Sequence, residues 1–267
     1  GILNVTIDPD EGFFADTVYD DVRGQAAGGS GDADGATDAQ VGSILNNLTR
    51  IADNELDNFT IELADYNLLT AGSKELLSSK MPDGVGLTIN GTDGNDSIVG
   101  TSGDDLLIGN DGNDTLEGGL GDDTIDGGAG DNELTGGSGN DTFISSNGGN
   151  STITDLSGSD VLQVVTDAST ATANNVSSWT ATSATYNNGT ATLNASDVDV
   201  GPTTINLADA SGPNGYTVNA GNGDDIITGS DFADTFNDLD DGDSVNGGAG
   251  NDEYNVSDGI IEIAEGL

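Results

Sequence analysis

Residues 91–144 read GTDGNDSIV GTSGDDLLI GNDGNDTLE GGLGDDTID GGAGDNELT GGSGNDTFI, six units of nine residues with no insertion between them. The fourth place of every unit is glycine. The sixth place is occupied in turn by Asp96, Asp105, Asp114, Asp123, Asn132 and Asp141. The eighth place is always apolar, with Ile98, Leu107, Leu116, Ile125, Leu134 and Phe143. Because ordinary solvated loops lack a fixed period, this stretch predicts a repeat architecture.

The spacing of the repeat predicts stacked coils. Glycines at the first and fourth places suit a turn, and the last three residues of each unit are long enough only for a short strand. One inward apolar side chain per unit builds no core alone, so the units must stack into a solenoid. Two units per coil place Asp96 over Asp114 and Asp105 over Asp123. Such carboxylates repel one another unless a cation lies between them, and oxygen ligands suit a hard ion such as Ca²⁺.

The repeat resembles that of the RTX family of secreted bacterial proteins, whose nonapeptide G-G-x-G-x-D-x-U-x, with U apolar, forms a calcium-binding parallel β-roll. Residues 118–126 and 136–144 match every fixed place. The resemblance implies several Ca²⁺ ions between turns, held by the sixth-place side chains and by loop carbonyls. The glycines expected to contribute are Gly94, Gly103, Gly112, Gly119, Gly121, Gly128, Gly130, Gly137 and Gly139. Asn132 has one charge fewer, which predicts weaker binding at its site.

The period returns over residues 220–255 in four further units. Their sixth-place residues are Asp225, Asp234, Asp243 and Asp252, and their candidate glycines are Gly223, Gly248 and Gly250. Phe232 and Asp241 replace the fourth-place glycine, which puts the two middle turns in doubt. Residues 153–164 are similar to segments that often close RTX blocks. Within them Asp155 and Asp160 are either further ligands or parts of a polar turn, and both interpretations stay open.

Charge sets strong limits on the function. The chain has 48 acidic residues and four basic ones, with no Lys, Arg or His after Lys80. The repeats therefore repel themselves unless cations bind, and metal binding is expected to supply most of the folding free energy. The charge excludes nucleic acid as a partner, and an anionic glycan or surface requires bridging Ca²⁺. Cysteine is absent, and no apolar run approaches the roughly 18 residues of a membrane span.

The location of the protein follows from the resemblance. RTX proteins are typically exported unfolded through a type I pathway with a C-terminal signal, and the first residues here lack the basic and apolar regions of a signal peptide. Scarce cytosolic Ca²⁺ predicts a disordered repeat region inside the cell, and millimolar Ca²⁺ predicts a folded one outside. We therefore expect a secreted protein, extracellular or at the cell surface. The chain is equally consistent with a processed product or a fragment.

Four segments are expected along the chain. Residues 1–88 predict a small α/β cap or assembly region, with strands near Val5 and Ile61, a helix near Ile44 and another over residues 73–81. Residues 89–165 hold the first β-roll. Residues 166–219 are rich in Thr and Asn and predict further β structure, in which the Asn188-Gly189 pair signals a hairpin. Residues 220–267 hold the second β-roll and a C-terminal strand. The fold class is thus mainly β, a parallel β-roll solenoid.

Several classes of enzyme are excluded by motif. Without histidine the chain has neither the HExxH zinc motif nor a Ser-His-Asp triad, and it lacks a GxSxG elbow. The leading hypothesis is a non-enzymatic structural protein of an S-layer, filament or adhesin stalk that self-associates or binds other surface proteins. One alternative is a calcium-folded export module of a larger secreted enzyme. Another is a glycan-binding adhesin that uses Trp179 and Tyr186, although a core role for these two aromatics is favoured.

Overall fold

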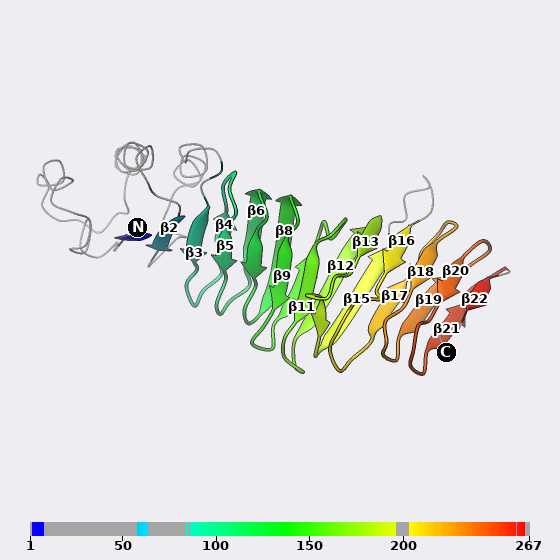
Figure 1. Ribbon diagram of the computed structural model, residues 1–267. Coiled ribbons are helices and arrows are strands. Elements are labelled where there is room, and N and C mark those ends of the chain that lie inside the picture. Colours follow the sequence, from blue (N-terminus) through cyan, green and yellow to red (C-terminus); the bar gives the residue numbers. More distant parts are fainter. Residues whose placement is uncertain are drawn as a thin grey trace, which may run out of the picture.

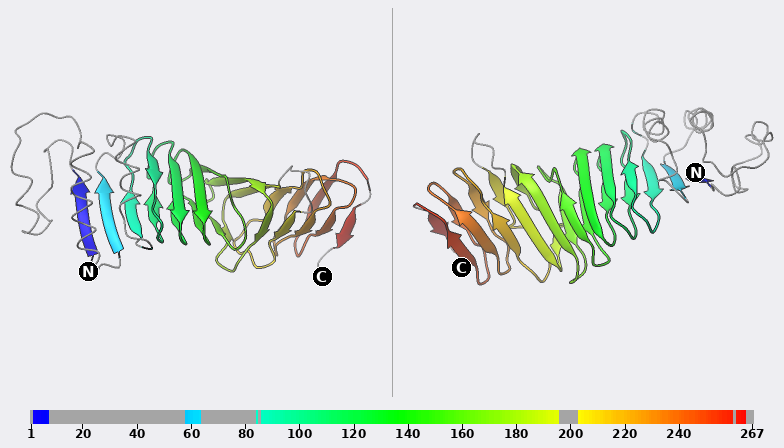
Figure 2. Two further views of the ribbon diagram at one scale, coloured as in Figure 1. Left: turned by 90° about the horizontal axis from the view of Figure 1, so that it is seen from above. Right: turned by 180° about the vertical axis from the view of Figure 1, so that it is seen from behind.

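The protein is a parallel β-solenoid. A computed structural model of the chain describes residues 2–7, 58–63, 84, 86–195, 203–259 and 261–264. These residues contain 22 strands, and all of their pairings are parallel. The coils stack from β3 to β22 into an elongated body (Figures 1 and 2). The solenoid expected from the nine-residue period is therefore confirmed.

Three sheets form the walls of the solenoid. Sheet 1 contains, in spatial order, β1 (Ile2–Ile7), β2 (Asn58–Leu63), β3 (Leu87–Asn90), β5 (Leu106–Ile108), β7 (Thr124–Asp126), β9 (Thr142–Ser145), β11 (Val161–Val164) and β14 (Tyr186–Asn187). Sheet 2 contains β4 (Ser97–Val99), β6 (Thr115–Leu120), β8 (Asp131–Ser138), β10 (Asn150–Ile153), β12 (Thr170–Val176), β15 (Thr190–Ala195), β17 (Tyr216–Asn219), β19 (Thr235–Leu239) and β21 (Glu253–Val256). Sheet 3 contains β13 (Ser178–Thr180), β16 (Thr204–Asn206), β18 (Ile226–Thr228), β20 (Ser244–Asn246) and β22 (Glu262–Ala264).

Coil length follows the sequence period. In the first block Leu116 pairs with Leu134, 18 residues on, so that two nine-residue units make one coil. The Thr- and Asn-rich section has longer coils, because Leu193 pairs with Val218, 25 residues on. The period of 18 returns where Val218 pairs with Phe236. One solenoid therefore runs through both blocks, and the β structure expected between them has coils of irregular length.

The core is a set of apolar columns that run through the stacked coils. Places six and eight of a unit point inward and place seven points outward, as the alternation of a strand requires. All six eighth-place residues of the first block are fully buried. In sheet 2 the column continues through Ile98, Leu116, Leu134, Ile153, Ala173, Leu193, Val218, Phe236 and Tyr254. Each coil thus covers the apolar side chain of its neighbour, as expected for units without a core of their own.

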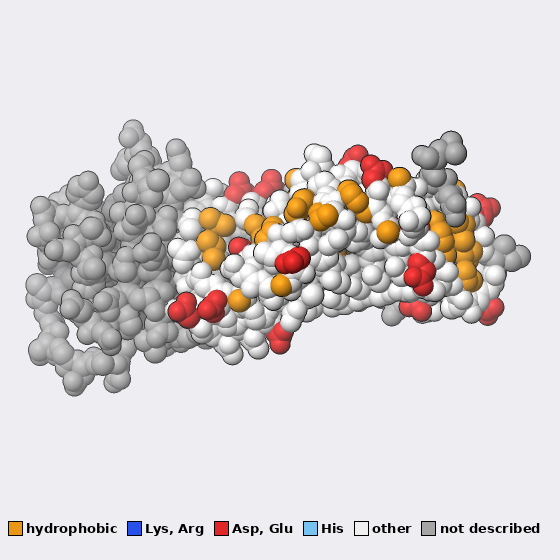
Figure 3. Space-filling model, turned by 90° about the horizontal axis from the view of Figure 1, so that it is seen from below, with side chains coloured by type: hydrophobic (Ala, Val, Ile, Leu, Met, Phe, Trp, Pro, Cys, Tyr) orange, Lys and Arg blue, Asp and Glu red, His pale blue; other side chains and the backbone are white. Residues whose placement is uncertain are grey.

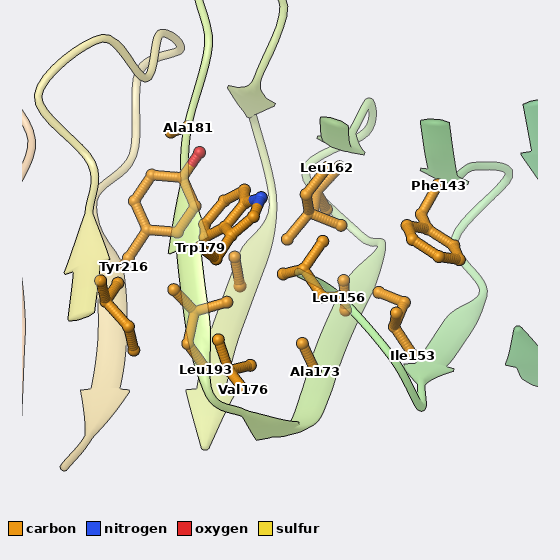
Figure 4. Close-up of a cluster of buried hydrophobic side chains, with 14 of the residues drawn as sticks. Phe143, Ile153, Leu156, Leu162, Ala173, Val176, Trp179, Ala181, Leu193 and Tyr216 are labelled. Carbon is orange, nitrogen blue, oxygen red and sulfur yellow. The ribbon is translucent and has the colours of Figure 1, made fainter. Parts of the chain in front are cut away.

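The largest side chains of the core lie where sheet 1 ends and sheet 3 begins. Trp179 in β13 is 0 % exposed, and its indole N–H donates to the carbonyl of Asp160 at 2.9 Å. Tyr216 in β17 lies beside it, among Leu193, Val176 and Ala181 (Figure 4). These aromatic rings fill the interior at the level where the wall of the solenoid changes from one sheet to another.

One expectation for this section is wrong, and the core role favoured for Trp179 is confirmed. The Asn188-Gly189 pair does not make a hairpin, because β14 and β15 lie in different sheets and each pairs in parallel with other strands. A methyl group on Gly189 would overlap the carbonyl oxygen of Ser169, so a close approach between coils explains this glycine. Trp179 cannot stack on a sugar because it is buried, which confirms the core role for it. Tyr186 is 37 % exposed.

The N-terminal segment is only partly described. Strands β1 and β2 occur where alternating apolar residues predict them, and β2 pairs in parallel with β3, which extends sheet 1 beyond the first repeat. The helices expected near Ile44 and over residues 73–81 lie outside the described residues, as does most of the expected α/β cap. Among the described residues, no helix has the length and hydropathy needed to cross a membrane.

Candidate calcium sites

The sixth-place side chains form hydrogen-bonded rows between successive coils, which we call the inner ladder. Oδ1 of Asp114 accepts the backbone N–H of Asp96 at 2.8 Å, and Oδ1 of Asp123 accepts that of Asp105 at 2.7 Å. The two stacked pairs predicted from the sequence are therefore confirmed. The same bond, at 2.9–3.0 Å, joins Asp114 to Asn132, Asp123 to Asp141, Asp225 to Asp243 and Asp234 to Asp252.

The inner ladder is buried. The five sixth-place aspartates of the first block are 1–3 % exposed. Their second carboxylate oxygens divide into two kinds. Oδ2 of Asp96 accepts the N–H of Thr92 at 2.6 Å, whereas Oδ2 of Asp114, Asp123 and Asp225 has no hydrogen-bond partner among the described residues. A buried carboxylate oxygen without a partner carries a large desolvation cost, which a bound cation would remove.

Burial changes the protonation of the ladder. Desolvation, together with the neighbouring carboxylates of Asp105 and Asp141, raises the pKa of Asp123 to about 8, against a hydrogen bond from Asp105 that lowers it. Desolvation likewise raises the pKa of other ladder residues to about 6, namely Asp105, Asp114, Asp160 and Asp225. In the metal-free state a fraction of these carboxylates is protonated, so protons and a cation compete for the same oxygens.

Backbone carbonyls face the same space between coils. A methyl group on Gly121, which has a φ of +113°, would lie 2.7 Å from the carbonyl oxygen of Gly103 in the preceding coil. A methyl group on Gly139 would overlap the carbonyl oxygen of Gly121. The fourth-place carbonyl of one coil therefore points at the fourth-place glycine of the next. The second-place glycines are equally close to the preceding coil, since a methyl group on Gly119 would overlap the carbonyl oxygen of Thr101.

The donor set fits a hard divalent cation. No group of three or more acidic side chains gathers at one point in the part of the chain that the structure describes. Each space between coils instead offers a stacked pair of carboxylates together with carbonyl groups, and Ca²⁺ accepts such mixed oxygen donors. No basic side chain lies among the described residues to compensate the carboxylates. The coloured, described part of the face in Figure 3 accordingly shows acidic and uncharged side chains and no basic ones.

Asn132 keeps the geometry of the ladder without its charge. Its Oδ1 accepts the N–H of Asp114 at 2.9 Å, and its Nδ2 donates to the carbonyl of Gly128 at 3.4 Å. An amide therefore satisfies the backbone as a carboxylate does, but it directs a donor where the aspartates have their second oxygen. This geometry is consistent with the weaker binding predicted at this place.

At the end of the first block, Asp155 and Asp160 occupy different positions relative to the inner ladder. Asp160 is buried and joins the inner ladder, because its Oδ1 accepts the N–H of Asp141 at 2.9 Å and its Oδ2 that of Ser157 at 2.8 Å. Asp155 lies apart from the ladder, since its two oxygens accept the N–H groups of Gly136 and Gly137.

The second block retains the ladder despite its missing glycines. Oδ1 of Asp225 accepts the N–H of Thr203 at 2.8 Å, and Oδ1 of Asp234 accepts that of Tyr216 at 2.7 Å. Asp243 accepts two N–H groups, from Asp225 and from Asp240, each at 2.9 Å. The two units with Phe232 or Asp241 at the fourth place therefore keep their sixth-place residues in register, although the sequence put their turns in doubt.

Sequence reasoning missed a second row of side chains, formed by the fifth-place residues of the first block, which we call the outer ladder. Oδ1 of Asp104 accepts the N–H of Asp122 at 2.9 Å, and Oδ1 of Asp122 accepts that of Asn140 at 2.7 Å. On the other edge, Oδ1 of Asn95 accepts the N–H of Asn113 at 2.8 Å, and Oδ1 of Asn113 accepts that of Asp131 at 2.9 Å. The signal was present in the sequence, because all six fifth places of this block are Asn or Asp.

An amide ladder crosses the outer face of sheet 2, and it too was not anticipated. Side-chain amide groups donate to one another from coil to coil at 2.6–2.9 Å along Asn174, Asn194, Asn219, Asn237 and Asn255. It begins in the Thr- and Asn-rich section and continues into the second block. This row ties five coils together through neutral groups alone.

Comparison with known proteins agrees with the geometry. The family model described as RTX calcium-binding nonapeptide repeat (4 copies) matches residues 90–125, 108–143, 117–153 and 218–255. These ranges cover both stretches in which the inner ladder has the 18-residue coil. No significant match was found among curated proteins or solved structures. RTX nonapeptide repeats bind several calcium ions per repeat region, so calcium is the cation that this solenoid takes. Residues 90–153 and 218–255 of the chain are thus RTX calcium-binding nonapeptide repeats.

Proposed function

We propose that the protein is a secreted structural protein that calcium folds outside the cell and that forms part of an extracellular surface assembly. Calcium ions would lie between coils, held by the inner ladder aspartates and by carbonyls of the turn glycines. In this proposal Asp155 is not a ligand, because its oxygens serve two backbone N–H groups outside the ladder. Asp160 is retained as a candidate.

One observation carries the calcium-folding part of the proposal. The ladder buries carboxylates, of which three have an oxygen without a partner, in a region that contains no basic residue. Burial of an uncompensated carboxylate costs several kcal/mol, so the metal-free solenoid is poorly stable at neutral pH. A divalent cation bound between the coils turns this cost of burial into a favourable interaction, which couples folding to the calcium concentration. Extracellular sites of about 10⁻⁴ to 10⁻³ M affinity are sufficient for such coupling.

The structural part of the proposal is supported by the use of the acidic residues. The buried carboxylates of both repeat blocks accept backbone N–H groups of adjacent coils, so they hold successive coils together rather than converge on a reaction centre. An elongated solenoid that is folded only outside the cell suits a spacer, a stalk or a lattice subunit. Type I secretion of an unfolded chain, implied by the repeats, is consistent with folding after export.

The test is a calcium titration of the chelated full chain, followed in parallel by far-ultraviolet circular dichroism and light scattering. The proposal predicts that large particles and the β structure of the two repeat blocks both rise with calcium and are lost with excess EDTA. A calcium-folded chain that stays monomeric would overturn the assembly role and favour a module of a larger secreted protein. Unchanged β structure in EDTA at neutral pH would overturn calcium folding itself.

A further inference from the structure

We propose that the outer ladder positions the carbonyl groups that bind calcium in the first block. The fifth-place Asn and Asp side chains lie outside the buried ladder and are not themselves offered as ligands. Their role would be to fix the orientation of the adjacent peptide groups before the cation arrives. This inference rests on the proposed calcium sites, and it adds to them a set of residues that tune affinity and ion selectivity.

The two ladders run in opposite directions. In the inner ladder a side chain reaches back to the preceding coil, as Asp123 does to the N–H of Asp105. In the outer ladder a side chain reaches forward to the following coil, as Asp104 does to the N–H of Asp122. Consecutive N–H groups of one turn are therefore held from opposite sides, and the turn is fixed from both neighbouring coils.

The direction of the outer ladder determines where a carbonyl points. The N–H of Asp122 belongs to the same peptide group as the carbonyl of Gly121. A trans peptide is planar and directs its N–H and C=O to opposite sides. When Asp104 holds the N–H toward the preceding coil, the Gly121 carbonyl must face the following coil. Its oxygen does face that coil, because it would overlap a methyl group on Gly139.

The second block lacks some of the side-chain acceptors that form the outer ladder in the first block. Its fifth places are Asp224, Ala233, Gly242 and Asn251. Ala233 stands at the place from which a side chain would accept the backbone N–H of Asn251, and its methyl group cannot accept a hydrogen bond. The carbonyl of Phe232 nevertheless lies near Gly250, where a methyl group would be 2.6 Å from its oxygen. The first block therefore has preset carbonyl groups, and the second depends more on the cation to order its turns.

Two neutral substitutions at Asp104 separate positioning from charge. Asp104→Asn removes the charge and keeps the Oδ1 acceptor, whereas Asp104→Ala removes both. Asn140→Ala is the matched control, because Asn140 ends the same row and its Oδ1 accepts no hydrogen bond among the described residues. Each full-length variant is chelated and then titrated with Ca²⁺ and, separately, with Sr²⁺, and β structure is followed by circular dichroism.

We expect Asp104→Ala to need about three to ten times more Ca²⁺ than Asp104→Asn at half-folding, the effect of about one net hydrogen bond. Asn140→Ala should titrate as the wild type does. Selectivity depends on the size and rigidity of the site, so Asp104→Ala should also change the ratio of the Ca²⁺ and Sr²⁺ midpoints. A role limited to general stability would raise both midpoints by one common factor.

Two results would overturn the inference alone while the wild type responds normally to calcium. One is identical Ca²⁺ midpoints for the Ala and Asn variants of Asp104. The other is an Ala variant whose Ca²⁺ and Sr²⁺ midpoints both rise by the same factor. A wild-type chain without any calcium response would instead overturn the proposed function, and this inference with it.

Discussion

Replacing Asp123 with asparagine removes one charge from the middle of the inner ladder and preserves its shape. The amide oxygen can accept the N–H of Asp105, which Oδ1 of Asp123 accepts at 2.7 Å. Asn132 already shows this arrangement in the native chain. The substitution therefore alters the metal-free and calcium-bound states through the second oxygen, which has no partner in Asp123.

The two states are expected to respond in opposite directions. In the metal-free fold the pKa of Asp123 is about 8 against an ordinary value of 3.8, which costs on the order of 3–5 kcal/mol at pH 7. Asparagine does not titrate, so Asp123→Asn stabilises the metal-free fold by up to that amount. In the calcium-bound state a neutral ligand replaces a charged one. That exchange costs about 1–2 kcal/mol, or roughly a 5- to 30-fold higher calcium midpoint.

The assay is a calcium titration by circular dichroism together with a urea unfolding curve in EDTA, both at pH 7. Asp122→Asn is the control, because it removes the same charge from the adjacent fifth place and keeps the acceptor for the N–H of Asn140. We expect the control to match the wild type in both measurements. The reasoning is refuted if Asp123→Asn leaves the calcium midpoint unchanged, or if it fails to stabilise the metal-free chain.

Three other predictions concern the metal-free state and the core. The folded-state pKa values of about 6 to 8 in the inner ladder lie above the ordinary value of 3.8. The metal-free fold should therefore have its full stability below about pH 3.8 and lose it as the pH rises through 6 to 8. Circular dichroism in EDTA that shows more β structure at pH 8 than at pH 5 would contradict this. Residues 161–219 contain only four acidic residues and three members of the amide ladder. We therefore expect hydrogen exchange in EDTA to leave strands β11 to β17 protected while residues 90–153 exchange fast. Uniform exchange would show that calcium folds every coil. Trp179→Ala should lower the free energy of unfolding, measured in urea with calcium present, by about 3–5 kcal/mol. A loss under about 1 kcal/mol would contradict the place of Trp179 in the core.

The nine-residue period contained most of the information about the fold. A fixed apolar eighth place and a fixed acidic sixth place decide which residues face inward, so the columns of Leu116 and Leu134 and the pairing of Asp105 with Asp123 could be read from spacing alone. The same spacing located the sixth-place residues of the second block even where Phe232 and Asp241 replace glycine.

Where the period fails, local signals mislead. Asn188-Gly189 predicts a hairpin from two residues, but the partners of β14 and β15 lie about one coil away along the chain and no local rule can find them. The switch from sheet 1 to sheet 3 near Trp179 likewise depends on how large side chains fill one level of the solenoid. Coil lengths of 20 to 26 residues in this section leave no repeat from which to infer register.

The ladders on the outside were missed for a different reason. The fifth place of the RTX repeat is unrestricted, so a run of Asn and Asp there looks like ordinary solvent-exposed polar residues. Its role depends on a hydrogen bond to a residue 18 positions away, such as that from the N–H of Asp122 to Asp104, and this becomes visible only when the coils are stacked. The amide ladder is hidden in the same way, because Asn194 and Asn219 lie 25 residues apart.

The position of the bound metal tests the central claim most directly. Crystals of the full chain grown in calcium should be measured at a wavelength where calcium scatters anomalously. The account predicts difference peaks between successive coils, in rows next to Asp105 and Asp123 on one edge and Asp96 and Asp114 on the other. A folded solenoid with no anomalous peak between its coils, or with peaks confined to the outer surface, would contradict it.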